Sequence, residues 1–169
     1  MAGRYTGPMD PIVTIRLATR KDAPAIALES MTEIEHGLSW TWNPDRVAEA
    51  IRDPNTNVAV AVADDAMLGF GIMRYEEEVA HLLLFAVHED SRRRGVGSAL
   101  LAWLEKVASV AGVNRLRAES RASNAVAREF YRKHGYVETG VVPRMYAKGV
   151  DGIRFEKVVA PPAAPDPAT

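Results

Sequence analysis

A strand, a basic glycine turn and a helix in the middle of the chain restrict its possible folds most strongly. The apolar run of residues 82–87 leads into Arg92-Arg93-Arg94-Gly95-Val96-Gly97. Apolar residues then recur at helical spacing as far as Ala111, and a second strand-like segment occupies residues 115–120. This strand-helix-strand order predicts a parallel, right-handed crossover within one sheet.

The turn has the features of an anion site. The first turn of a helix leaves N–H donors unpaired and carries a partial positive charge, and glycine allows close approach of the backbone. The P-loop pattern is absent, and the dinucleotide fingerprint would require glycine where Leu100 stands. The turn alone therefore leaves two interpretations, a phosphate site or a plain connection with solvated arginines.

Composition narrows the class of protein. The 169 residues are 47% hydrophobic, which suits one domain with a sizeable core. A formal charge of −1 gives no general attraction to nucleic acid or to an anionic membrane. The absence of cysteine excludes disulfides and thiolate metal sites, and no histidine pair or carboxylate cluster suggests a metal. No apolar run is long enough to span a bilayer and no signal-peptide pattern opens the chain, so we expect a soluble cytoplasmic protein.

The pattern of hydrophobic residues predicts seven strands and four helices. The strands are expected at residues 12–17, 57–63, 67–75, 79–87, 115–120, 136–141 and 153–159, and the helices at 19–34, 45–52, 96–111 and 122–134. The fold class is therefore α/β, with the order β-α-α-β-β-β-α-β-α-β-β and helices on both faces of a mixed sheet. We expect a flexible segment at 1–11, a single domain at 12–159 and a disordered Pro/Ala-rich tail at 160–169.

A second motif identifies a family resemblance. Glu119-Ser120-Arg121-Ala122-Ser123-Asn124 is followed by Tyr131 and by Gly135-Tyr136. Together with Arg92-x-x-Gly95-x-Gly97, these residues resemble the signatures of the GNAT superfamily of acetyl-CoA-dependent N-acetyltransferases, whose element order also matches. The E-x-R-A-S-N string is most similar to the ribosomal-protein alanine N-acetyltransferases. The segments around Trp40 and at 144–152 differ from that group, so the resemblance implies the chemistry and leaves the acceptor open.

The resemblance implies a binding site for acetyl-CoA as cosubstrate, with no metal. Backbone N–H groups of Arg93, Arg94, Gly95, Val96, Gly97 and Ser98 would hold the pyrophosphate, with Arg92 as the side-chain signature. Backbone groups of Phe85, Ala86 and Val87 would pair with the pantetheine amides. Asn124 would hydrogen-bond the pantetheine and also cap the helix that it begins.

The resemblance also implies two catalytic side chains. Tyr131 is the candidate general acid for the departing thiolate; the alternative is an aromatic residue of the core. Glu119 is the candidate general base; the alternatives are ordered water as the base, with Glu119 paired to Arg115, Arg117 or Arg121. Trp40, Trp42 and His81 are weaker candidates for the acceptor site, since loop packing or a structural histidine would explain them equally.

We therefore expect acetyl transfer to a primary amine by direct attack in a ternary complex. No cysteine and no G-x-S-x-G elbow is present to form an acyl-enzyme. The acceptor is either a protein N-terminus or a small molecule such as an amino acid, a polyamine or an antibiotic. The alternatives are a non-catalytic coenzyme A sensor and a Rossmann-type nucleotide binder. The sequence leaves monomer and homodimer equally open.

Overall fold

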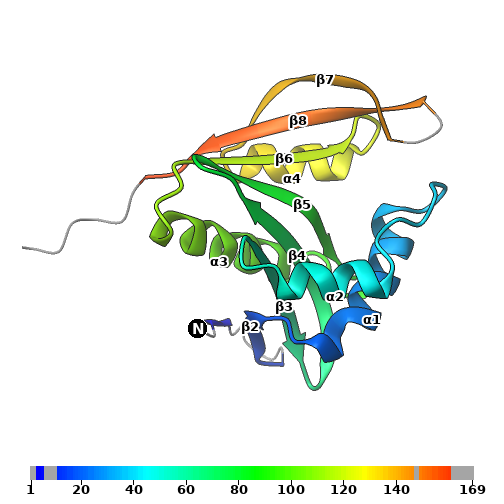
Figure 1. The fold of residues 1–169 in the computed structure, drawn as a ribbon, viewed down its shortest axis with the longest axis vertical. Helices are drawn as coiled ribbons and strands as arrows, with labels where there is room; N and C mark the ends of the chain where they lie inside the picture. The colour runs from blue at the N-terminus through cyan, green and yellow to red at the C-terminus, as the bar shows by residue number, and fades with distance from the viewer. Residues whose placement is uncertain (1–2, 6–10, 147–148, 161–169) are drawn as a thin grey trace, which may run out of the picture.

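One mixed sheet of eight strands forms the centre of the protein (Figure 1). The structure, a computed structural model, describes residues 3–5, 11–146 and 149–160. The strands are β1 (Gly3–Tyr5), β2 (Val13–Leu17), β3 (Thr56–Ala63), β4 (Ala66–Tyr75), β5 (Val79–Val87), β6 (Arg115–Arg121), β7 (Val137–Tyr146) and β8 (Val150–Val158). They lie in the order β1-β2-β3-β4-β5-β6-β8-β7, and β5 and β6 are the one parallel pair among them.

Local signals in the sequence fix where the helices begin. The helical segments are η1 (Arg20–Asp22), α1 (Ala23–Glu29), the π-helical η2 (Ser30–Ile34), α2 (Pro44–Arg52), η3 (Glu89–Ser91), α3 (Val96–Val110) and α4 (Ala125–Lys133). Asn43 and Asn124 cap α2 and α4, because each side-chain oxygen accepts a backbone N–H at 3.0 Å. Gly95 precedes α3 in the left-handed conformation, with φ of 79°.

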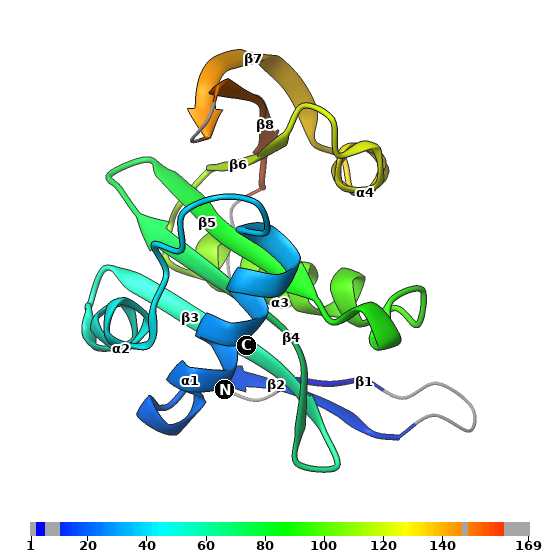
Figure 2. The same ribbon diagram turned by 90° about the vertical axis from the view of Figure 1, so that its right-hand side faces the viewer.

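The helices cover both faces of the sheet (Figure 2). α1 and α2 lie on one face, over a buried cluster that includes Ile26, Val47 and Phe70. α3 and α4 lie on the other face, over a larger cluster that includes Leu100 and Leu104. This arrangement confirms the predicted fold class, a mixed sheet with helices on both faces.

A bulge in β5 separates this strand from β6. Ile72 of β4 pairs with Leu84 and the next residue, Met73, pairs with Leu82, so Leu83 is the extra residue. The parallel pairing of β5 with β6 covers Val79 to Leu82 and goes no further, although both strands continue. Beyond this point the two strands diverge toward the right of Figure 1 and leave a gap in the sheet.

The structure corrects three predicted elements. Residues 3–5, expected to be flexible, form β1, which pairs with β2; residues 1–2, 6–10 and 161–169 lie outside the described chain. The helix expected at 19–34 is divided into η1, α1 and η2, since the Glu35 N–H bonds the Ser30 carbonyl five residues back. β7 and β8 together reach from Val137 to Val158, because they form a longer hairpin than the short apolar runs indicated.

Candidate active site

The glycine turn places a row of unpaired N–H groups at the start of α3. The first helical hydrogen bond is that of Ala99 N–H to the Gly95 carbonyl, at 3.0 Å. The N–H groups of Val96, Gly97 and Ser98 precede this bond, and no side chain caps the helix. Arg93 also adopts a left-handed conformation, with φ of 63°. The turn therefore has the open, positively polarised backbone that an anion requires.

Arg92 is the arginine of the turn whose side chain contacts the rest of the protein. Arg92 donates from Nε to the Val87 carbonyl at 3.1 Å and forms an ion pair with Glu33 of η2. Its guanidinium therefore faces the α1 side of the sheet, and all three arginines of the turn are exposed. Nearby, burial raises the pKa of Glu29, whose Oε1 atom has no hydrogen-bond partner among the described residues.

Ser98 lies on the opposite side of the turn from Arg92. Its hydroxyl contacts Nε2 of His134 at 2.8 Å, and Nδ1 of His134 contacts the Phe130 carbonyl at 2.7 Å. A carbonyl only accepts, so Nδ1 carries the proton and Nε2 accepts from the hydroxyl. This contact fastens the start of α3 to the end of α4.

The end of β5 presents backbone groups to the gap. The His88 N–H donates to the Leu68 carbonyl in the β4 direction, at 2.7 Å. Because hydrogen-bonding direction alternates along an antiparallel strand, the backbone groups of Val87 and Phe85 point the other way, into the gap. The Phe85 ring stacks on Phe130 with centroids 5.6 Å apart, while the Ala86 side chain is buried in the α1 cluster.

Tyr131 lies in the core at the α4 side of the gap. Its ring packs against Tyr136 and Phe155, with centroids 5.3 and 5.0 Å away. Its hydroxyl has no hydrogen-bond partner among the described residues, and the hydroxyl oxygen retains some solvent exposure. Burial raises the pKa of Tyr131, and the charges of Tyr146 and Glu119 raise it further. The phenol is therefore protonated at neutral pH and has a hydrogen to donate.

Glu119 approaches the gap from the opposite face. On β6 it alternates with Ala118 of the α3 cluster, so its side chain points toward the α1 and α2 side. Its Oε2 hydrogen-bonds Nε2 of His81, and its Oε1 accepts from Nε of Arg154 at 3.3 Å. The side chain is only 5% exposed. Glu119 contacts neither Arg115, Arg117 nor Arg121, which corrects those pairings.

The partners of Glu119 control its ionisation. Burial raises the pKa of Glu119, but hydrogen bonds and charge from His81 and then Arg154 outweigh that effect and lower the pKa overall. Glu119 is thus a carboxylate at neutral pH. Burial, with a smaller contribution from the charge of Glu119, raises the pKa of Tyr146 to about 12.

Two residues near the gap, Arg154 and Tyr146, were not singled out from the sequence, and a third, Arg121, has partners that the sequence did not indicate. Arg154 lies directly opposite Glu119 in the β6–β8 register, and Tyr146 lies at the end of β7. Arg121 donates to the carbonyls of Ile34 and His36, at 2.7 and 2.6 Å, and so fastens the loop after η2 to β6. The contacts of Arg154 and Arg121 join residues at least 35 positions apart, so no local sequence signal predicts them.

The two tryptophans have different environments in the loop before α2. Trp42 is partly buried against the α1 cluster, with the guanidinium of Arg46 4.0 Å from the centre of its ring. Trp40 is 44% exposed. Glu35 holds the loop by accepting from Thr41 N–H and its hydroxyl, at 2.8 and 2.6 Å. Trp42 is therefore a packing residue, and Trp40 is the more accessible of the two.

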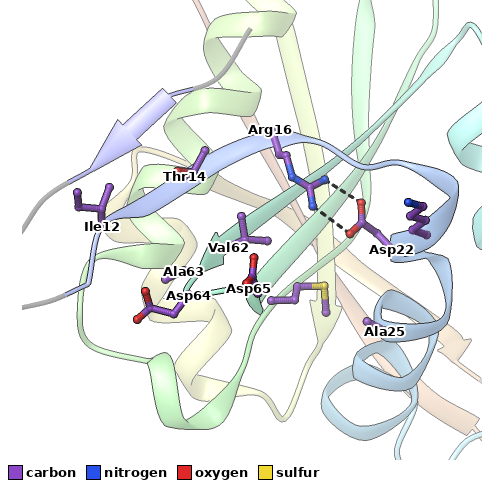
Figure 3. A pocket seen from close by; sticks show the side chains of 11 residues that line it. Ile12, Thr14, Arg16, Asp22, Ala25, Val62, Ala63, Asp64 and Asp65 are labelled. Carbon is purple, nitrogen blue, oxygen red and sulfur yellow. Dashed lines mark hydrogen bonds and ion pairs between the residues drawn. The ribbon is translucent and has the colours of Figure 1, made fainter.

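A separate depression of about 490 Å³ lies between β2, the start of α1 and the β3–β4 hairpin (Figure 3). The Arg16–Asp22 ion pair, at 2.8 Å, lies beside it. None of the predicted site residues lines this depression. Within the described ranges, no group of His, Asp and Glu side chains is arranged to hold a metal. No helix in the described part of the chain is long and apolar enough to cross a membrane.

Known proteins are similar to this chain in sequence and in fold. The profile of the acetyltransferase (GNAT) family matches residues 24–136. An N-acetyltransferase of Methanocaldococcus jannaschii, itself uncharacterised, is 34% identical over 58% of this chain and 64% of its own length. The [ribosomal protein bS18]-alanine N-acetyltransferase of Salmonella typhimurium is 38% identical over 50% of this chain and 57% of its own length. The structure of Ard1 from Thermoplasma volcanium has a TM-score of 0.78 at 27% identity and covers 88% of this chain and 98% of Ard1.

The matches to the two sequence relatives each cover less than two thirds of the relative's length. The family profile covers more than half of this chain and includes both the glycine turn and the Asn124–Tyr131 segment. The matched residues also include β5 and β6, the two strands on either side of the gap. The chain belongs to the GNAT family of acetyltransferases.

Proposed function

We propose that this protein transfers the acetyl group of acetyl-CoA to the α-amine of a protein N-terminus. One observation carries the proposal: Tyr131 and Glu119 approach the gap between β5 and β6 from opposite faces of the sheet. A thioester lying in this gap would be open to an amine on the Glu119 face and to a proton donor on the Tyr131 face.

The free backbone groups fit acetyl-CoA. The N–H groups of Val96, Gly97 and Ser98 would bind the pyrophosphate. A single charge at a helix end contributes about 0.3–1 kcal/mol, and several N–H donors acting together would contribute more. The edge of β5 at Phe85 and Val87 would pair with the pantetheine amides. The Val87 carbonyl already accepts from Arg92, so this contact would yield to, or be shared with, the bound cosubstrate.

The reaction would proceed by direct attack. A neutral amine adds to the thioester carbonyl, and the Val87 N–H, which points into the gap, would stabilise the developing oxyanion. Glu119 takes the amine proton, directly or through water. The C–S bond then breaks, and the thiolate of coenzyme A receives the Tyr131 proton.

The electrostatics of Glu119 favour an α-amine over a lysine-type amine. A carboxylate with a lowered pKa is a weak base, so the acceptor must lose its proton easily. An α-ammonium has a pKa of about 7.7–8.0, whereas that of lysine is about 10.4. The names of two relatives, the ribosomal-protein enzyme of Salmonella typhimurium and an N-alpha-acetyltransferase of Sulfurisphaera tokodaii, agree with this choice.

An acceptor screen tests the proposal. Release of the coenzyme A thiol would be followed with N-terminal peptides, ribosomal ones included, and with amino acids, polyamines and aminoglycosides. We expect the highest kcat/KM with peptides that have a free α-amine. Turnover confined to small amines would replace the peptide by a small-molecule acceptor, and binding of acetyl-CoA with no turnover at all would favour a sensor.

A pair of glycine variants tests the pyrophosphate site. Gly95→Ala and Gly112→Ala each force alanine into a left-handed conformation, with φ of 79° and 88°, at the two ends of α3. Each should cost about 1–2 kcal/mol of folding stability. We expect Gly95→Ala alone to weaken acetyl-CoA binding, by about tenfold in calorimetry. Equal affinities in the two variants would remove the turn from the cosubstrate site.

A further inference from the structure

One charged face of the sheet extends from Glu119 across β6 and β8. Arg117, Glu119 and Arg121 of β6 point toward the α1 and α2 side, and Glu156 and Arg154 of β8 lie opposite Arg117 and Glu119. Between Arg117 and Arg121 this face thus holds three guanidinium groups and two carboxylates, and Arg115 lies on the same face at the start of β6. The amine acceptor of the proposed function would enter over these residues.

Arg117 and Arg121 on this face each make two hydrogen bonds to protein groups. Arg117 donates twice to Glu156, from Nε at 3.2 Å and from Nη2 at 3.1 Å. Arg121 is directed at the carbonyls of Ile34 and His36. Each therefore has a structural role that a ligand would have to disrupt.

Arg154 makes one side-chain hydrogen bond, where each of these two makes two. It makes a single contact with Glu119, at 3.3 Å from Nε, which is long for a hydrogen bond between charged groups. Arg128, by contrast, forms a two-point contact with Glu138 at 2.9 and 3.1 Å. The remaining nitrogens of Arg154 have no partner in the described chain, and its side chain is 38% exposed.

The neighbouring strand also leaves room beside Arg154. The residue paired with it on β7 is Gly140, and nothing lies within 4 Å of the position that a Cβ would occupy there. The Glu119 carboxylate is meanwhile drawn toward His81 by its other oxygen. The guanidinium is thus free to turn from Glu119 toward a ligand that lies over β7 and β8.

We propose that Arg154 selects acceptors that carry a carboxylate close to the reacting amine, the first choice being an acidic side chain on the first or second residue of an N-terminal peptide. This inference rests on the proposed function. Because Arg154 contacts Glu119, an amine bound beside Glu119 would lie close to the guanidinium. A carboxylate on the first or second residue of a peptide lies only a few bonds from the α-amine and would therefore reach Arg154. The two terminal nitrogens of the planar guanidinium are left to donate in a two-point contact.

Binding of such an acceptor would also affect the base. Arg154 is one of the groups that favour ionised Glu119. When an acceptor carboxylate draws the guanidinium away, Glu119 loses part of this stabilisation and becomes a better proton acceptor. A matching acceptor would then improve its own deprotonation as well as its binding.

The test compares peptides that are identical except for Glu, Gln or Lys at the first or second residue. For the unmodified protein we expect kcat/KM to be about tenfold higher with Glu than with Lys. Arg154→Gln should abolish the preference, Arg154→Glu should reverse it, and Arg154→Lys should retain part of it. Arg132→Gln is the matched control, because Arg132 pairs with Glu138 and that variant makes the same change in net charge.

The outcomes separate this inference from the proposed function. No preference in the unmodified protein, or the same preference in Arg154→Gln and Arg154→Glu variants whose thermal unfolding is unaltered, would overturn the role of Arg154. Turnover of amino acids but not of peptides would overturn the peptide acceptor alone. The preference of Arg154 for a carboxylate would then be measured by comparing kcat/KM for glutamate with that for spermidine. No turnover of any amine would overturn both.

Discussion

Replacing Tyr131 by phenylalanine is expected to lower kcat at least tenfold while leaving acetyl-CoA affinity within about twofold of its original value. Proton transfer by a positioned side chain contributes about 10²–10⁴-fold to a rate. The substitution removes one oxygen and leaves the ring in contact with Tyr136 and Phe155. The hydroxyl has no hydrogen bond to lose within the described chain, so the fold should be little affected.

Tyr136→Phe is the matched control for this experiment. Tyr136 is equally buried and contacts Tyr131, but its hydroxyl donates to Glu105 at 3.0 Å. Loss of that bond should reduce stability by about 0.5–1.5 kcal/mol without reducing turnover. Steady-state rates and acetyl-CoA titrations of both variants decide the matter, and unchanged turnover in Tyr131→Phe would exclude Tyr131 from the mechanism.

Glu119→Gln should also have a large effect, a loss of about a hundredfold in kcat. The amide keeps the shape of the side chain but cannot accept the amine proton. The matched control is Glu156→Gln, which changes a carboxylate on the same face that pairs with Arg117 and contacts neither His81 nor Arg154. Equal rates in the two variants would point to ordered water as the base.

The same variant should alter the dependence of stability on pH. The pKa of Glu119 is lower in the folded protein than its ordinary value of 4.5, so the folded state favours the ionised form. The resulting stability is fully present above about pH 4.5 and is lost as the pH falls through the lowered value. Urea unfolding should therefore show a weaker loss of stability on acidification in Glu119→Gln than in the unmodified protein.

Local signals explain the part of the fold that was predictable from sequence. Gly95 marks the start of α3 because a left-handed residue is required there, and Asn124 marks the start of α4 as a cap. Both are short-range effects, so the element order and the two motifs could be predicted. β1 lacks such a signal, since three residues become a strand only by pairing with β2.

The charge arrangement at the site depends on strand register instead. His81 reaches Glu119 because β5 and β6 pair in parallel up to Leu82, and Arg154 reaches it from a strand 35 residues later. A shift of one residue in either register would turn these side chains to the other face. The sequence therefore indicated Glu119 itself but not the partners that lower its pKa.

The most direct test of the proposed function locates the acetyl group in the product. The protein would be incubated with acetyl-CoA and two peptides, one with a free N-terminus and no lysine, the other with a blocked N-terminus and one lysine. Mass spectrometry of the fragments identifies the modified nitrogen. We expect acetylation of the free α-amine, at a rate that falls at least tenfold in Tyr131→Phe. Acetylation of the lysine peptide alone, or of neither, would contradict it.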